Sequence, residues 1–164
     1  MPTDTAESPR TSVLFVCLGN ICRSPLAEAI FQQLVVEAGL EEKFDIESAG
    51  TGAWHVGERP DARAEMVANQ HGVQLLSRAR QLTDQDLEHF DFVIAMDREN
   101  LRGIERMADA IGSDAEVRLL RDFDSEGAGD DVPDPYYGGA SGFESVYDMI
   151  HRSCKGLLDR LKSV

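Results

Sequence analysis

The stretch formed by residues 13–24, VLFVCLGNICRS, constrains this chain more than any other. It begins with an apolar run rich in β-branched residues, which is typical of a buried strand. After that run and a short loop, Ser24 and Pro25 open a predicted helix, as a preferred N-cap and a favoured first helical residue. A strand, a tight loop and a helix N-terminus direct backbone N–H groups and the positive helix end to one place. The sequence therefore predicts an anion-binding loop, in which Gly19 and Asn20 most easily adopt positive φ angles.

Two side chains make this anion site a candidate reaction site. Cys17 ends the predicted strand below the loop, where the loop amides, the helix end and Arg23 should favour its thiolate form. The planar guanidinium of Arg23 suits two oxygens of a tetrahedral oxyanion. A thiolate, a ring of N–H donors and an arginine together indicate in-line attack on phosphorus. A buried strand cysteine without chemistry is the simpler alternative, but it leaves the spacing of Arg23 and Ser24 unexplained.

The segment CLGNICRSPLAEA, which begins at Cys17, resembles the C-x5-R-S signature of the low molecular weight protein tyrosine phosphatases. A second block, Asp134-Pro135-Tyr136-Tyr137, resembles the general-acid loop of that family, and residues 48–55 resemble its bacterial branch. The similarity covers residues 11–162. It implies a Rossmann-like or flavodoxin-like phosphatase fold, and hydrolysis of phosphotyrosine and aryl phosphates through a phosphocysteine intermediate.

Displacement of a phenolate calls for a carboxylic acid above the phosphoryl group, to protonate the leaving oxygen. Asp130, Asp131 and Asp134 all lie in the same segment, and the residues alone do not choose among them. An Asp-Pro pair without further context more often initiates a turn. The resemblance implies that Asp134 is the general acid and base, that Cys17 is the nucleophile, and that Arg23 binds the phosphate and the transition state.

The resemblance also implies the rest of the site. The expected phosphate-binding loop comprises Leu18, Gly19, Asn20, Ile21, Cys22 and Ser24. Trp54, Tyr136 and Tyr137 would form an aromatic wall against the substrate ring, whereas without the resemblance they could equally be half-buried loop anchors. Ser48 would support the loop through hydrogen bonds with Asn20. Besides capping the helix, Ser24 can donate a hydrogen bond to the Cys17 thiolate.

Three further positions have alternative interpretations. His55 either contacts the substrate or faces solvent. Ser77 stands where animal members of the family often have a histidine that completes the hydrogen-bond network, so we leave it outside the expected site. Cys22 either forms a reversible disulfide with an oxidised Cys17 or is only a small loop residue. The remaining cysteine, Cys154, is expected in the core.

Composition narrows the possible partners. The chain has 16 basic and 30 acidic residues, a formal net charge of −14, which argues against nucleic acid and anionic membranes. Three cysteines make no disulfide framework, and no stretch resembles a signal peptide or a membrane span. Cys17-x4-Cys22 is not a common zinc spacing, and the four histidines are scattered. We therefore expect a cytoplasmic monomer that uses no metal and no cofactor.

Apolar runs alternate with helical patterns along the 164 residues. Strands are predicted at 13–17, 44–48, 92–96 and 117–120, and helices at 26–37, 61–71, 97–110 and 143–161, with a capping box at 83–86 opening a short helix. This pattern predicts one α/β catalytic domain over residues 11–164, with a parallel sheet covered by helices on both faces, after a disordered tail of residues 1–10. The resemblance implies four strands in the order 2-1-3-4.

Two rival functions differ in class from a tyrosine phosphatase. The first is a thiol-dependent arsenate reductase on the same fold, although residues 77–100 contain no cysteine to relay a disulfide. The second is a phosphate-binding module, which would need neither a thiolate nor an acid. We expect the partner to be a phosphotyrosine-containing protein, with bacterial tyrosine kinases as one such class.

Overall fold

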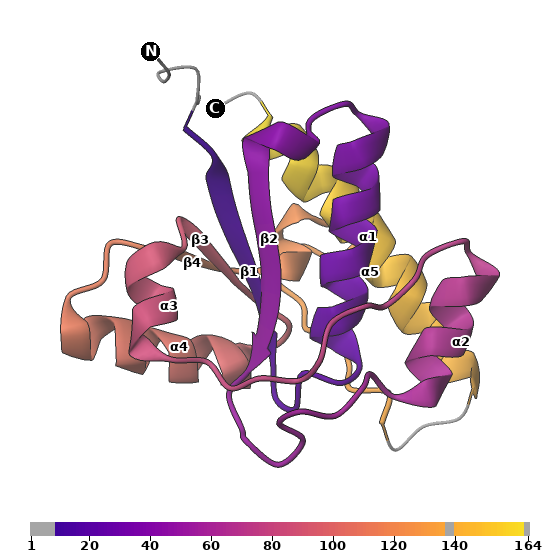
Figure 1. Ribbon diagram of the computed structural model, residues 1–164, viewed down its shortest axis with the longest axis horizontal. Coiled ribbons are helices and arrows are strands. Elements are labelled where there is room, and N and C mark those ends of the chain that lie inside the picture. Colours follow the sequence, from indigo (N-terminus) through magenta and orange to yellow (C-terminus); the bar gives the residue numbers. More distant parts are fainter. Residues whose placement is uncertain (1–8, 137–139, 163–164) are drawn as a thin grey trace.

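The computed structural model describes residues 9–136 and 140–162. At its centre lies a four-stranded sheet in the order β2-β1-β3-β4, in which all three pairings are parallel (Figure 1). The strands are β1 (Thr11–Cys17), β2 (Phe44–Gly50), β3 (Phe92–Ala95) and β4 (Glu116–Leu119). The predicted α/β class and strand order are therefore confirmed.

Helices cover both faces of the sheet (Figure 1). One face carries α1 (Arg23–Glu37), α2 (Ala62–Gln70) and α5 (Ala140–Leu161), and the other carries α3 (Asp84–His89) and α4 (Arg98–Ile111). Because successive strand residues point to opposite faces, Val13 and Phe15 of β1 pack toward α1 and α5, whereas Leu14 and Val16 pack toward α3 and α4. This burial on both faces explains the continuous apolar run of β1.

Most helix ends follow the local signals. Thr83 forms the predicted capping box with Asp86, and Asp97 caps α4 by accepting a hydrogen bond from the Asn100 N–H. The connection between the predicted strand 117–120 and the predicted helix 143–161 is shorter at both ends than the sequence pattern indicates. Its first residues belong to the short 3-10 helix η2 (Leu120–Phe123), and α5 begins at Ala140 rather than Phe143. Gly142, whose low helix propensity suggested a loop, lies in the first turn of α5.

The ends of the chain bear on two expectations. Most of the tail predicted for residues 1–10 lies outside the described residues. Arg10 is placed, and its guanidinium donates to the Asp45 carboxylate at 3.0 Å and to the Phe44 carbonyl at 2.7 Å, beside the 3-10 helix η1 (Glu41–Lys43) and the start of β2. No helix within residues 9–136 and 140–162 is both long enough and apolar enough to cross a lipid bilayer.

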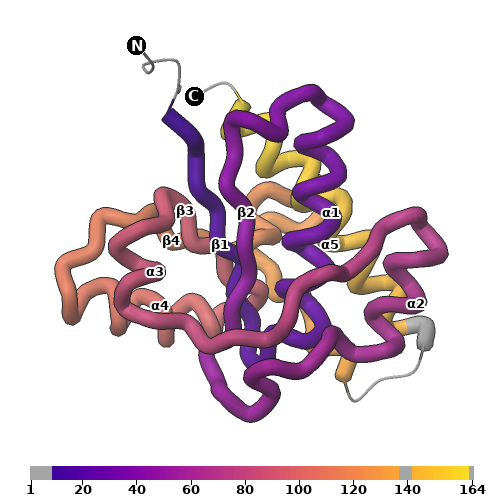
Figure 2. The backbone as a smooth tube through the Cα atoms, viewed as in Figure 1, coloured from indigo at the N-terminus to yellow at the C-terminus, as the bar shows by residue number. Residues whose placement is uncertain are grey.

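Parallel strands bring the loops that follow β1 and β2 to the same end of the sheet (Figure 2). The two loops are in close contact, since a Cβ added at Gly50 would lie 2.8 Å from the Leu18 carbonyl oxygen. Gly50, the last residue of β2, therefore allows the chain to pass directly beside the loop after Cys17. The carboxyl ends of parallel strands, where ligands commonly bind, are thus densely packed with backbone in this protein.

The buried carboxylate of Asp124 fixes the segment that follows η2 and leads to Asp134. Asp124 follows η2 with its side chain fully buried, and it accepts hydrogen bonds from Arg121, Arg152 and the Glu126 N–H at 2.7–3.1 Å. Burial alone would raise the pKa of Asp124, but these hydrogen bonds lower it to about 2. Arg121 also donates to the Asp131 carbonyl at 3.1 Å, so Asp124 and its two arginines connect α5 to the acidic loop of residues 125–134.

Asp124→Asn should destabilise the fold by about 2 kcal/mol at pH 7, which is the free-energy equivalent of the lowered pKa. A depressed carboxyl pKa stabilises the folded state above the pKa of the unfolded chain, near 4, and this contribution is lost as the pH falls toward 2. The gap between wild type and variant in urea unfolding should therefore shrink between pH 5 and pH 2.5. Asp130→Asn, whose side chain is 64 % exposed, is the matched control and should leave stability unchanged. A gap that stayed constant with pH would show that the charge of Asp124 is not the stabilising feature.

Candidate active site

The segment after β1 forms a tight loop that begins at Cys17 and ends where α1 begins, at Arg23. Asn20 has a φ of 58°, in the left-handed region that the sequence predicts for it. The same expectation for Gly19 is wrong, because the positive-φ residues of the described chain do not include it. Gly19 instead makes room for a neighbour, since an added Cβ would lie 3.0 Å from Cδ2 of His55.

The role predicted for Ser24 as a helix N-cap is also wrong. The helix begins at Arg23, and Cys22 is the N-cap, without a side-chain capping bond. The Ser24 hydroxyl lies inside the first turn and points to the loop, with its Oγ 3.0 Å from Sγ of Cys17. The hydrogen bond expected between Ser24 and Cys17 is thus possible in this geometry, whereas capping is not.

The Cys17 sulfur is buried and surrounded by hydrogen-bond donors. The N–H of Asn20 donates to Sγ at 3.3 Å, and the Ser24 hydroxyl shares a hydrogen bond with Sγ in which either atom can be the donor. Cys22, in the same loop, is 4 % exposed, and burial, Asp61 and Cys17 raise the pKa of its thiol. Cys22 therefore stays a protonated thiol near neutral pH. Its expected disulfide with Cys17 stays a prediction.

Arg23 is almost fully buried, with 3 % of its surface exposed, and hydrogen bonds hold its charged side chain in position. Its Nη1 donates to Oδ2 of Asp97 at 2.7 Å and to the Val132 carbonyl at 3.0 Å. Burial works against the charged guanidinium, but Cys17 and the neighbouring carboxylates outweigh burial and raise the pKa of Arg23 above its usual value. The guanidinium therefore stays charged next to the sulfur.

Of the three acids that the sequence left open, Asp134 is the one that lines the cavity above Cys17. Its Oδ2 lies 3.5 Å from Nη2 of Arg23, and its Oδ1 accepts a hydrogen bond from the Tyr136 N–H at 3.0 Å. Asp131 accepts instead from the Arg98 N–H, and Asp130 is 3.9 Å from Arg121. The structure thus brings Asp134 into the cavity that Cys17 also lines, although it does not test the role predicted for Asp134.

The cavity above the loop has a volume of about 420 Å³. Its lining residues are Cys17, Leu18, Gly19, Ile21, Cys22, Arg23, Trp54, His55, Asp134 and Tyr136. Trp54, with 72 % of its surface exposed, and Tyr136, with 36 %, stand at the mouth, where a ring entering the cavity would cover them. His55 also lines the cavity, with its ring 6.3 Å from that of Tyr136. Tyr137, the third predicted wall residue, lies outside the described residues.

A hydrogen-bond network behind the loop includes residues that the sequence analysis missed. The side-chain amide of Asn20 donates to Oγ of Ser24 at 2.7 Å and to Oγ of Ser48 at 3.0 Å, so the expected contact with Ser48 is present. Its Oδ1 accepts from the Arg80 N–H at 3.0 Å. The Ser48 hydroxyl in turn donates to Oε1 of Glu28 at 2.5 Å. Glu28 could have been found from its position, four residues after Ser24 on one helix face.

Glu28 connects this network to Ser77, the position that we left outside the site. Burial raises the pKa of Glu28, and hydrogen bonds from Ser48 and Ser77 only partly oppose this. Ser77 therefore takes part in the network through Glu28. Both residues also line a second cavity of about 560 Å³, whose lining does not include Cys17.

Comparisons with known proteins agree with this geometry. A family model described as low molecular weight phosphotyrosine protein phosphatase matches residues 12–164. A protein of that name from Schizosaccharomyces pombe is 52 % identical over 139 residues, which are 84 % of this chain and 88 % of the relative.

Solved structures extend the similarity to the fold. The crystal structure of YfkJ from Bacillus subtilis superposes with a TM-score of 0.88 and 41 % identity, over 96 % of this chain and 98 % of that one. The crystal structure of DARP, a Drosophila arginine phosphatase, superposes with a TM-score of 0.86 and 37 % identity, over 92 % and 97 % of the two chains.

The network predicts that Glu28 supports the loop from behind. Glu28→Ala removes the acceptor of the Ser48 hydroxyl, so the loop amides should hold inorganic phosphate about tenfold more weakly. Glu28→Gln keeps an acceptor oxygen and should bind phosphate nearly as well as wild type. Isothermal titration with phosphate measures both, with the exposed Glu42→Ala as the control. Equal affinity of the alanine variant and wild type would rule out a supporting role.

Proposed function

The chain belongs to the low molecular weight phosphotyrosine protein phosphatase family, and from this membership we propose that it hydrolyses phosphotyrosine through a phosphocysteine on Cys17. The observation that carries the proposal is the convergence of Cys17, Arg23 and Asp134 on one cavity. A cavity that only binds an anion needs neither a nucleophilic sulfur nor a carboxylic acid at its mouth. The same convergence supports hydrolysis over a binding module.

In the first step, the Cys17 thiolate attacks phosphorus. The S–P bond forms as the P–O bond to the phenol breaks, and Asp134 gives its proton to the departing phenolate oxygen. Because Asp97 and Val132 hold Nη1 of Arg23, its Nη2 faces the side of the cavity where Asp134 lies. The guanidinium and the loop N–H groups stabilise the charge on the equatorial oxygens.

In the second step, water hydrolyses the phosphocysteine. The Asp134 carboxylate now accepts a proton from water, the new O–P bond forms, and the S–P bond breaks to release inorganic phosphate. The Ser24 hydroxyl, 3.0 Å from Sγ, donates to the sulfur and stabilises the departing thiolate. Cys17 returns to its starting state, so the cycle needs no further reactant.

The cavity lining supports an aryl substrate. Leu18 and Ile21 present apolar side chains beside the loop, and the aromatic rings of Trp54 and Tyr136 stand at the mouth. A phenyl ring carries its phosphate farther from the peptide chain than a serine side chain does, so only a phosphotyrosine would reach the sulfur while its ring contacts the wall. We propose a phosphotyrosine-containing protein as the substrate.

The activity test compares phosphotyrosine, phosphoserine and phosphoarginine as substrates of the reduced protein in EDTA. Phosphotyrosine alone should be turned over, and Cys17→Ser should lower kcat by more than about a thousandfold because the nucleophile is lost. Cys154→Ser, which changes a buried cysteine of α5 that does not line the cavity, is the matched control.

Other outcomes would redirect the assignment. Turnover of phosphoarginine in place of phosphotyrosine would move the chain to the activity named for the Drosophila structure. Absence of all turnover would favour the arsenate reductase alternative, which a thiol-coupled arsenate assay detects. Phosphotyrosine hydrolysis that survives in Cys17→Ser would contradict the phosphocysteine mechanism.

The role of Asp134 can be tested by comparing substrates whose leaving groups differ in their need for a proton. Asp134→Ala should lower kcat for phenyl phosphate by about a hundredfold or more, since the phenolate then leaves without a proton. The loss should be much smaller for 4-nitrophenyl phosphate, whose leaving group needs less protonation. Asp130→Ala controls for a lost acid in the same segment. An equal loss for both substrates would show that Asp134 acts other than as general acid.

A further inference from the structure

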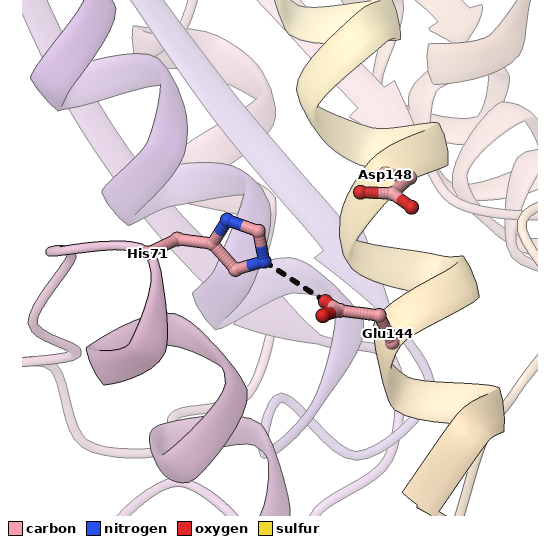
Figure 3. Close-up of side chains that lie close together, drawn as sticks. All are labelled: His71, Glu144 and Asp148. Carbon is pink, nitrogen blue, oxygen red and sulfur yellow. Dashed lines mark hydrogen bonds and ion pairs between the residues drawn. The ribbon is translucent and has the colours of Figure 1, made fainter.

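A second cluster of chemically active side chains lies away from the cavity of Cys17, where the end of α2 meets α5. His71 is the C-cap residue of α2, and Glu144 and Asp148 are four residues apart on α5. Residues with this spacing lie one above the other on the same face of a helix. Figure 3 shows the His71 ring extending from α2 toward both carboxylates.

The ligand atoms of these three residues are close together. Nε2 of His71 lies 2.9 Å from Oε2 of Glu144, and one ligand atom from each of the three residues lies within 4.8 Å of the others. Nitrogen and oxygen ligands bind zinc at about 2.0–2.2 Å, which places them roughly 3.3 Å apart around the ion. Small rotations of these surface side chains would therefore reach bonding geometry.

The His71 ring is already held in orientation. It stacks on the ring of Tyr147, with centroids 4.0 Å apart and an angle of 11° between the planes. Tyr147 is 4 % exposed and belongs to the same face of α5 as the two carboxylates, so the stacking fixes the imidazole to the helix that carries the other ligands. An imidazole fixed in this way loses little further freedom when it binds an ion.

The surroundings of the cluster favour a cation. His71, Tyr147, Asp148 and Glu37 line a hollow of about 300 Å³ together with His151. Glu37 and Asp148 thus place two carboxylates around this hollow. Burial, Lys155 and His71 lower the pKa of His151, so His151 adds no positive charge near pH 7.

We propose that His71, Glu144 and Asp148 bind a divalent transition-metal ion, with zinc as the type case, which clamps α2 to α5. One imidazole and two carboxylates suit zinc better than magnesium or calcium, which prefer ligand sets made only of oxygen. The ion would act on structure rather than in the phosphatase reaction, because none of its three ligands lines the cavity of Cys17, and His71 and Asp148 line a separate hollow.

The clamp would also bear on the mouth of the active site. The first turn of α2 carries Arg63, whose guanidinium lies 5.4 Å from the ring centre of Tyr136 and 4.7 Å from that of Phe143 in α5. The N–H of Asp61, the N-cap of α2, donates to the Ile21 carbonyl of the loop at 2.8 Å. An ion at the other end of α2 would therefore hold a helix that contacts both the loop and the aromatic wall.

Zinc titration of the full chain tests the clamp by calorimetry in the Cys17→Ser background, which removes the active-site thiolate as a competing ligand. One saturable zinc site is expected. Adding His71→Gln should weaken zinc binding at least tenfold, and so should adding Glu144→Gln with Asp148→Asn. His89→Gln, which changes a histidine of α3, should leave affinity unchanged.

Thermal unfolding supplies a readout that is independent of activity. Saturating zinc should raise the Tm of the Cys17→Ser protein by roughly 5 °C, whereas the His71→Gln variant should show no shift. The Tm of each variant in EDTA establishes that it folds without the ion. Absence of a saturable site in the Cys17→Ser protein, or a zinc affinity that His71→Gln leaves unchanged, would overturn the proposal. The phosphatase assay in EDTA does not depend on either result.

Discussion

The left-handed backbone of Asn20 and the hydrogen bonds of its side chain are the constraint on which the active-site loop depends. The positive φ turns the chain so that the Asn20 N–H points at the Cys17 sulfur. The side-chain amide then holds Ser24 and Ser48, and its oxygen accepts from the Arg80 N–H. One residue therefore sets the loop shape through its backbone and attaches that shape to three other segments through its side chain.

A second constraint comes from the far end of the chain. Arg23 is the first residue of α1. Its Nη1 donates to Asp97, which follows β3, and to the carbonyl of Val132, which lies in the acidic loop. That loop is in turn held by the buried Asp124 and its two arginines. The position of Asp134 above the sulfur thus follows from a chain of charged contacts across the sheet edge. Such contacts cost less than isolated buried charges because each guanidinium finds a carboxylate or a carbonyl.

Features that depend on a local pattern or on a long motif can be predicted from the sequence. The apolar run of β1 predicts its buried strand, and the capping box at Thr83 depends on only four residues. The errors at Gly19 and Ser24 have a common cause, because both residues make tertiary contacts that local propensity does not encode. Position 19 favours glycine because the His55 ring packs closely against it, and not because a turn there needs a positive φ angle.

The residues that the sequence does not reveal are those whose partners come from other elements of the fold. In the sequence, Glu28 has the pattern of an ordinary surface acid of an amphipathic helix. Its partner Ser48 lies in β2, not in that helix. His71, Glu144 and Asp148 likewise have no sequence spacing typical of a metal site, since α2 and α5 are joined in space rather than along the chain. The spacing of residues along the sequence can reveal metal ligands that lie in one helix or strand, but it cannot reveal ligands that two separate elements bring together.

Charge inside the cavity resolves the apparent conflict between an acidic chain and an anionic substrate. With 30 acidic and 16 basic residues, the surface repels phosphate at long range, but physiological salt screens that field within about 8 Å. Arg23 is buried, so its own field is screened far less. Nη2 of Arg23 lies 3.5 Å from Oδ2 of Asp134, so a phosphate dianion must compete with that carboxylate for the guanidinium.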